Sequence, residues 1–223
     1  MKILYPLILR FFLYALSMLG TILIIKQDFA DGLVLESSSI EISQETLLAI
    51  CILLLLYVGS TYEKFKIFNL ALAGVLVVHF VREFDFWLNY NLFDNSWQVF
   101  ALVFVIATFY LIFKNFNRFV TELYQVSKTY SFGIFLVGFI ILHVFSRFFG
   151  SKKIWNVILE PGYLGYVKTE EGEKVISFYD YVYPVKAGVQ ESVELLAYAL
   201  ICIGVVEMTI FVIKSSRNSK YEH

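Results

Sequence analysis

Six stretches of this sequence are apolar over a length that can cross a lipid bilayer, which takes about 20 residues of α-helix. Hydrophobic residues make up 59% of the chain, whereas a soluble domain has about 45–50%. The sequence therefore predicts an all-α, polytopic membrane protein with a single six-helix transmembrane domain over residues 1–223. The expected spans are residues 3–25, 46–62, 68–87, 97–113, 131–149 and 192–213.

Charge and cysteine content narrow the possible functions. A formal net charge of -1 argues against a nucleic-acid partner. Cys51 and Cys202 fall in separate spans without CxxC spacing, so we expect small buried apolar residues and not a disulfide, metal or redox pair. The first apolar stretch contains Arg10 and is longer than the core of a signal peptide, so we expect an uncleaved first span.

The links between the spans differ in charge. Those on the side of the two termini are basic, whereas the opposite links hold most of the acidic residues. Because Lys and Arg in short links stay on the cytoplasmic side, we expect both termini to be cytoplasmic, in an inner (plasma) membrane. The basic residues of the short links are Lys64, Lys66, Lys114, Arg118 and Lys128.

Three of these links carry structural signals. Residues 32–43 alternate loosely like a short strand or an extended cap, with a helix start near Ser43. The basic, amphipathic segment 114–130 is expected to lie at the membrane interface or to extend the ends of the adjacent helices. The long link 150–190 predicts a small extracytoplasmic hairpin between the fifth and sixth spans, with its turn near Gly172. Glycines 74, 133, 138 and 204 are candidates for close helix contacts.

The third span ends in an unusual cluster of ionisable side chains. His79, Arg82, Glu83 and Asp85 lie within seven residues, at the end of a stretch apolar enough to face lipid. Such groups normally face a protein interior or a wet cavity, because exposure to lipid costs a few kcal/mol each. On a helix, His79 and Glu83 share one face. We therefore expect a polar pocket near the outer end of this span.

Two other spans add polar groups at the same predicted depth. His143 and Arg147 are four residues apart in the fifth span, and Glu191 and Glu194 are three apart at the start of the sixth. In the predicted topology these pairs and the cluster of the third span all lie near the outer surface. The leading hypothesis is a metal site for Zn, Fe or Mn, with His79, Glu83, His143, Glu191 and Glu194 as candidate ligands.

The expected metal site suggests a hydrolytic activity, because a bound metal activates water for hydrolysis of a lipid or extracytoplasmic substrate. Whether the protein is an enzyme stays open at this point. A second hypothesis is an anion or lipid-headgroup site for binding or transport, with Arg82 and Arg147 as ligands, Asp85 beside them, and Lys152 and Lys153 above. A haem between His79 and His143 is the weakest alternative.

A third possibility is purely structural, since intramembrane charges often neutralise one another as ion pairs. A separate pair of this kind is expected near the cytoplasmic side. Arg10 and Glu207 lie at similar predicted depths in the first and sixth spans. The sequence thus predicts a salt bridge between these two residues, which would close the bundle.

Overall fold

The computed structural model describes residues 4–30, 38–158, 165–169, 172–176 and 178–218. Within these parts, five helices are long and apolar enough to cross a membrane, and a bent helix pair adds a sixth candidate. The chain is therefore a multi-pass helical membrane protein, as the sequence predicts. The candidate spans are Ile8–Ala30, Ser39–Thr61, Ser96–Lys114, Tyr130–Phe149 and Val185–Arg217, and the bent pair is Lys66–Glu83 with Asp85–Asn91.

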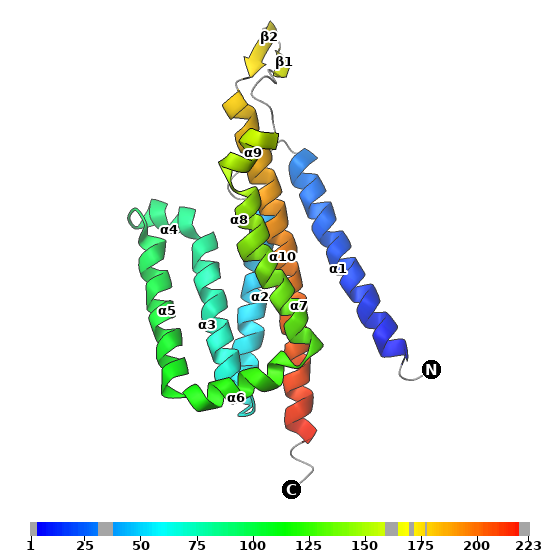
Figure 1. Cartoon of the computed structure of the whole chain (residues 1–223), viewed down its shortest axis with the longest axis vertical. Helices are drawn as coiled ribbons and strands as arrows, with labels where there is room; N and C mark the ends of the chain where they lie inside the picture. The colour runs from blue at the N-terminus through cyan, green and yellow to red at the C-terminus, as the bar shows by residue number, and fades with distance from the viewer. Residues whose placement is uncertain (1–3, 31–37, 159–164, 170–171, 177, 219–223) are drawn as a thin grey trace. The chain divides into compact units, whose positions relative to one another are not determined.

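The described elements are helical apart from one pair of short strands (Figure 1). They belong to two compact units, unit 1 (Met1–Ile42 and Phe139–Ala197) and unit 2 (Ser43–Gly138 and Tyr198–His223). The helices are α1 Leu4–Ala30, α2 Ser39–Thr61, α3 Lys66–Glu83, α4 Asp85–Asn91, α5 Ser96–Lys114, α6 Phe116–Ser127, α7 Tyr130–Ile140, the π turn η1 Ile141–Phe145, α8 Ser146–Phe149, α9 Lys152–Ile158 and α10 Phe178–Asn218. The strands are β1 Gly165–Thr169 and β2 Gly172–Ile176.

In unit 2, α3 and α5 run antiparallel and pack along their length, with the short α4 joining their ends (Figure 1). The chain bends by 61° between α3 and α4. The expected third span, residues 68–87, therefore contains a bend, and that the bent pair crosses the membrane as one span stays a prediction. Asp85 occupies the first turn of α4, where a carboxylate favours a new helix start because it faces the positive end of the helix dipole.

The core of unit 2 is formed by one face each of α2 and α3 together with the second half of α10. Leu55, Leu76 and Ile201 are fully buried there, and the ring of Phe65 packs at a tilt against that of Phe211 with 5.4 Å between ring centroids. Gly204 lets α10 approach α7, because an added Cβ would lie 2.7 Å from the backbone nitrogen of Phe135. This close contact fits the preference of membrane helices for small residues at their interfaces.

The first turn of α3 is capped from another helix. Phe65 precedes it in a left-handed conformation (φ 64°) and offers no capping side chain. The carboxylate of Glu122 on α6 instead accepts the backbone N–H of Phe68 (2.8 Å) and the guanidinium N–H of Arg118 (2.7 Å). α6 lies within the basic, amphipathic segment 114–130 that is expected at the membrane interface. This segment therefore holds the start of α3 in place.

Arg118 also contacts Glu63 in the link between α2 and α3. Hydrogen bonds with Lys66 and Arg118 lower the pKa of Glu63, and the hydrogen bond with Glu122 raises the pKa of Arg118. Because the pKa of Glu63 is lowered on folding, its small stabilising contribution is present above its ordinary pKa and is lost as the pH falls through the folded value.

In unit 1, an acid on α1 caps α2. The carboxylate of Asp28 accepts the backbone N–H groups of Ser39 (3.2 Å) and Ile40 (2.9 Å). The strand-like reading of residues 32–43 is therefore wrong from Ser39 onwards, and its first part, residues 32–37, lies outside the described residues. α2 begins four residues before the expected start at Ser43. The cap comes from a distant residue, which the local sequence pattern does not reveal.

The remainder of unit 1 contains the strands and the first half of α10. β1 and β2 pair antiparallel, with Val167 opposite Lys174. That this pair forms an extracytoplasmic hairpin stays a prediction. α10 begins at Phe178, well before the expected start of the sixth span at residue 192, because polar residues such as Lys186 and Glu191 end the apolar pattern but not the helix.

We predict that Gly204→Ala destabilises the protein by about 1–3 kcal/mol, because the new methyl group overlaps backbone atoms of Phe135 that cannot rotate away. The matched control is Gly133→Ala on α7, where nothing lies within 4 Å of an added Cβ. Thermal unfolding of the purified protein in detergent measures both. Equal stability of the two variants would contradict the close contact between α7 and α10.

Candidate functional site

The residues expected to form one polar pocket lie in both units. Each group is described within its own unit, and their meeting in one pocket stays a prediction. Unit 2 holds His79, Arg82 and Glu83 on α3 and Asp85 on α4, whereas unit 1 holds His143 in η1, Arg147 on α8, and Glu191 and Glu194 on α10.

In unit 2, the carboxylate of Glu83 is the centre of a small hydrogen-bonded group. It accepts the phenol O–H of Tyr198 (2.5 Å) and forms an ion pair with Arg82 (2.6 Å). Tyr198 is fully buried on α10, while the side chains of Arg82 and Glu83 are 22% and 13% exposed. This group ties α3 to α10, and it leaves part of the guanidinium of Arg82 at the surface.

In unit 1, Glu194 is almost fully buried and has donors on two sides. The hydroxyl of Ser146 and the amide N–H of Gln190 (3.1 Å) both donate to the same carboxylate oxygen. Gly150 makes room for Gln190, because an added Cβ would lie 2.5 Å from its amide oxygen. Buried polar groups of this kind are stable only when hydrogen-bonded, so the cluster holds α8 against α10.

A π turn, Ile141–Phe145, interrupts the fifth span and contains His143. π turns are rare and often occur at functional sites. After this turn Ser146 is fully buried, whereas His143 is exposed and packs edge-on against Phe139, with 4.2 Å between ring centroids. The turn therefore supplies the buried hydroxyl that Glu194 requires, and the imidazole lies at the surface of the described structure.

Three basic side chains follow the π turn at the end of this span. Arg147 on α8 and Lys152 and Lys153 on α9 are exposed, and no ion pair joins them to an acid among the residues that the structure describes. Trp155 lies beside them with only 8% exposure, and its indole N–H donates to the carbonyl of Phe149 (2.5 Å). We name Arg147, Lys152 and Lys153 the basic rim.

The expected salt bridge between Arg10 and Glu207 involves both units and stays a prediction. Glu207 is buried on α10 and accepts the phenol O–H of Tyr130 at the start of α7. Tyr130 is a partner that the sequence reading missed, as are Tyr198 and Ser146. Their only local signal is a hydroxyl inside or next to an apolar span, and many unrelated residues share that feature.

The two cysteines are closer than the sequence suggests. Both are free thiols in unit 2, with Cys51 buried on α2. The side chains of Cys51 and Cys202 are neighbours, so the middle of α2 lies against the middle of α10. No spacing motif links residues so far apart in the sequence, so only the fold reveals this contact.

Within the described ranges, no group of three or more His, Cys, Asp or Glu side chains is arranged to hold a metal ion. The site for Zn, Fe or Mn and its hydrolytic chemistry stay predictions. Comparison of the sequence with known protein families, with characterised proteins and with solved structures found no match.

We predict that Ser146→Ala destabilises the protein by about 1–2 kcal/mol, because it removes a donor from the buried carboxylate of Glu194. Ser127→Ala is the matched control, since the exposed hydroxyl of Ser127 donates only to a carbonyl of its own helix. Unfolding by denaturant in mixed micelles provides the measurement. A loss in the control as large as in Ser146→Ala would refute the role of this hydrogen bond.

Proposed function

We propose that this multi-pass membrane protein binds a phosphate-type anion at the basic rim. One observation carries the proposal: Arg147, Lys152 and Lys153 are exposed within seven residues and have no acidic partner among the described residues. Two ligands carry such an anion: the headgroup of an anionic phospholipid, and free inorganic phosphate.

Position and charge support this function. The basic rim lies at the end of the candidate span Tyr130–Phe149, with Arg147 in its last turn and Lys152 and Lys153 just after it, which is where headgroups are expected. Trp155 beside it belongs to the residue type that favours the membrane interface. Each basic side chain close to such a surface contributes about 1 kcal/mol of attraction to anionic lipid. A guanidinium adds forked hydrogen bonds that match a phosphate.

Arg82 supports the proposal less directly than Arg147. Its guanidinium is already an ion-pair partner of Glu83, so part of its charge is neutralised within unit 2. The anion site proposed here therefore rests on unit 1 alone.

We further propose an inner-membrane protein with six spans, in which the bent pair counts as one span and both termini are cytoplasmic. The excess of Lys and Arg in the short links on the side of the termini supports this topology.

A tag after His223 should then resist protease in right-side-out vesicles and become cleavable in inverted ones. Cleavage of the tag in right-side-out vesicles would contradict the topology.

The binding test uses the full chain in nanodiscs that contain phosphatidylglycerol and phosphatidylcholine. We predict that the triple variant Arg147→Gln, Lys152→Gln, Lys153→Gln binds phosphatidylglycerol about a hundredfold more weakly than the wild type, measured by native mass spectrometry after mild delipidation. Neutral amides keep the side-chain size similar while they remove the attraction to an anionic headgroup.

The charge-matched control is the triple variant Lys64→Gln, Lys114→Gln, Lys128→Gln. Each of these three ammonium groups lies over a different aromatic ring. A second arm measures thermal stabilisation by inorganic phosphate in detergent, which the wild type shows only if the free anion binds. Equal lipid retention and equal phosphate response in both triple variants would refute the proposed function.

A further inference from the structure

The span that ends at the basic rim carries a strip of exposed apolar side chains. Ile140 of α7, Val144 of η1 and Phe148 of α8 are 44%, 57% and 53% exposed. They follow one another at four-residue spacing, so they lie along one side of the span. We name these three residues the apolar strip. It covers about 12 Å along the helix axis at 1.5 Å per residue.

The apolar strip leads up to the guanidinium of the basic rim. Arg147 lies three residues beyond Val144, so the two side chains share one side of the span. Both are exposed, and they belong to the same unit. A cation therefore lies at the end of the strip that faces the membrane surface.

The two lysines of the rim are held near the same end of the span. The indole N–H of Trp155 on α9 donates to the carbonyl of Phe149, the last residue of α8, and the two rings are 6.4 Å apart between centroids. This contact fastens α9 to the end of the span. Lys152 and Lys153, which open α9, are thereby kept close to the point where the span ends.

A ligand that uses the whole of this surface must be both anionic and apolar. Free phosphate would contact the rim alone, and a neutral lipid would gain only from the strip. An anionic phospholipid matches both parts, because its headgroup carries the charge that three cations attract and its acyl chains lie directly beneath that headgroup.

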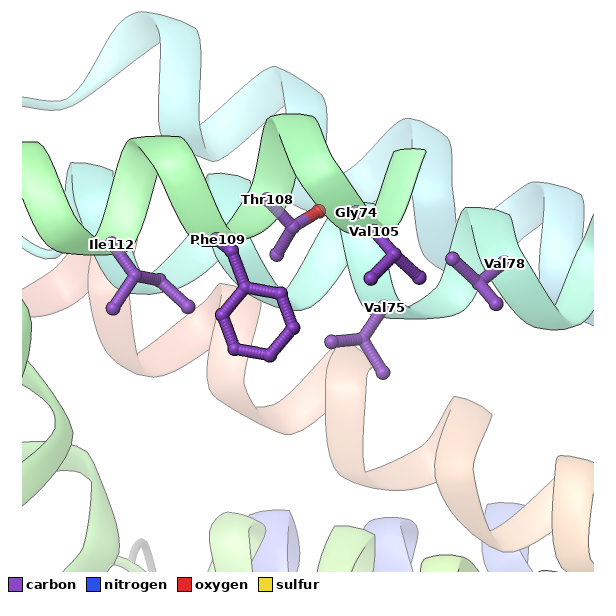
Figure 2. A pocket seen from close by; sticks show the side chains of 7 residues that line it. All are labelled: Gly74, Val75, Val78, Val105, Thr108, Phe109 and Ile112. Carbon is purple, nitrogen blue, oxygen red and sulfur yellow. The ribbon is translucent and has the colours of Figure 1, made fainter. Parts of the chain in front are cut away.

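A groove between α3 and α5 in unit 2 provides a contrast (Figure 2). Its lining includes Val75, Val105 and Phe109, and none of its seven lining residues is charged. Nothing in that lining distinguishes an anionic lipid from a neutral one. In unit 1, by comparison, the apolar strip and the cations occur together.

We infer that the basic rim and the apolar strip together bind one anionic phospholipid, with its headgroup at the rim and an acyl chain along the strip. This inference rests on the proposed function and narrows its ligand from any phosphate-type anion to a lipid.

The test uses the full-length protein in phosphatidylcholine nanodiscs that contain a small fraction of a lipid probe. The probe carries a photoactivatable diazirine near the middle of one acyl chain and has a phosphatidylglycerol or a phosphatidylcholine headgroup. Crosslinks mapped by mass spectrometry should fall on Ile140 and Val144 several-fold more often with the phosphatidylglycerol probe. Equal labelling of these residues by the two probes would overturn the inference.

An internal control comes from α5. Val103 and Ile106 are also more than half exposed, and α5 contains no Lys or Arg before Lys114. Both probes should therefore label these two residues equally. A preference for phosphatidylglycerol as large here as on the apolar strip would show that the strip has no selectivity of its own and would overturn the inference.

The rim variant Arg147→Gln, Lys152→Gln, Lys153→Gln should lower labelling of the strip by the phosphatidylglycerol probe to the phosphatidylcholine level. The control variant Lys64→Gln, Lys114→Gln, Lys128→Gln should keep the wild-type ratio. A preference for phosphatidylglycerol that persists in the rim variant would also overturn the inference.

The response to inorganic phosphate separates failure of this inference from failure of the proposed function. If the two lipid probes label the strip equally while phosphate stabilises the wild type and not the rim variant, the ligand is the free anion and only the lipid inference fails. If neither the labelling nor the response to phosphate depends on the rim, both proposals fail.

Discussion

The structure depends on one constraint, which is that a carboxylate removed from water must be supplied with donors. Each buried acid that the structure describes meets this requirement with a donor on a different helix. Asp28 receives backbone N–H groups of α2, Glu122 one of α3, Glu194 the hydroxyl of Ser146 on α8, and Glu207 that of Tyr130 on α7. Glu83, slightly less buried, receives Tyr198. Apolar packing alone distinguishes poorly between helix partners in lipid, so these acids specify which helices associate.

The sequence was informative where a property is local. The multi-pass helical character, the buried acids Glu194 and Glu207, and the close approach at Gly204 all follow from residue type and position along the chain. Gly133 was also a candidate for a close helix contact, but nothing lies within 4 Å of a Cβ added at this position. Local patterns therefore identify candidates for packing and polar contacts but not which of them are used.

Properties that depend on distant residues were not predictable. The start of α2 is determined by Asp28, eleven residues before Ser39 and on another helix. Tyr198 lies 115 residues from its acceptor Glu83, and Cys51 and Cys202 are neighbours across a still longer separation in sequence. The start of α10 was misplaced for another reason, because hydropathy indicates where a helix enters lipid and not where the helix itself begins. The relative depth of His79 and His143 likewise depends on residues far apart in the sequence.

The π turn at Ile141–Phe145 has a consequence for how this span tolerates length changes. A π turn accommodates one residue more than the α-helical turn that it replaces. Deleting one residue there would convert the segment to a continuous α-helix, with Phe139 and Ser146 still on either side of it. Insertions and deletions are normally excluded from transmembrane helices, because every following side chain rotates by about 100°. The fifth span thus contains a position where the chain can shorten by one residue without reorienting the residues that follow it.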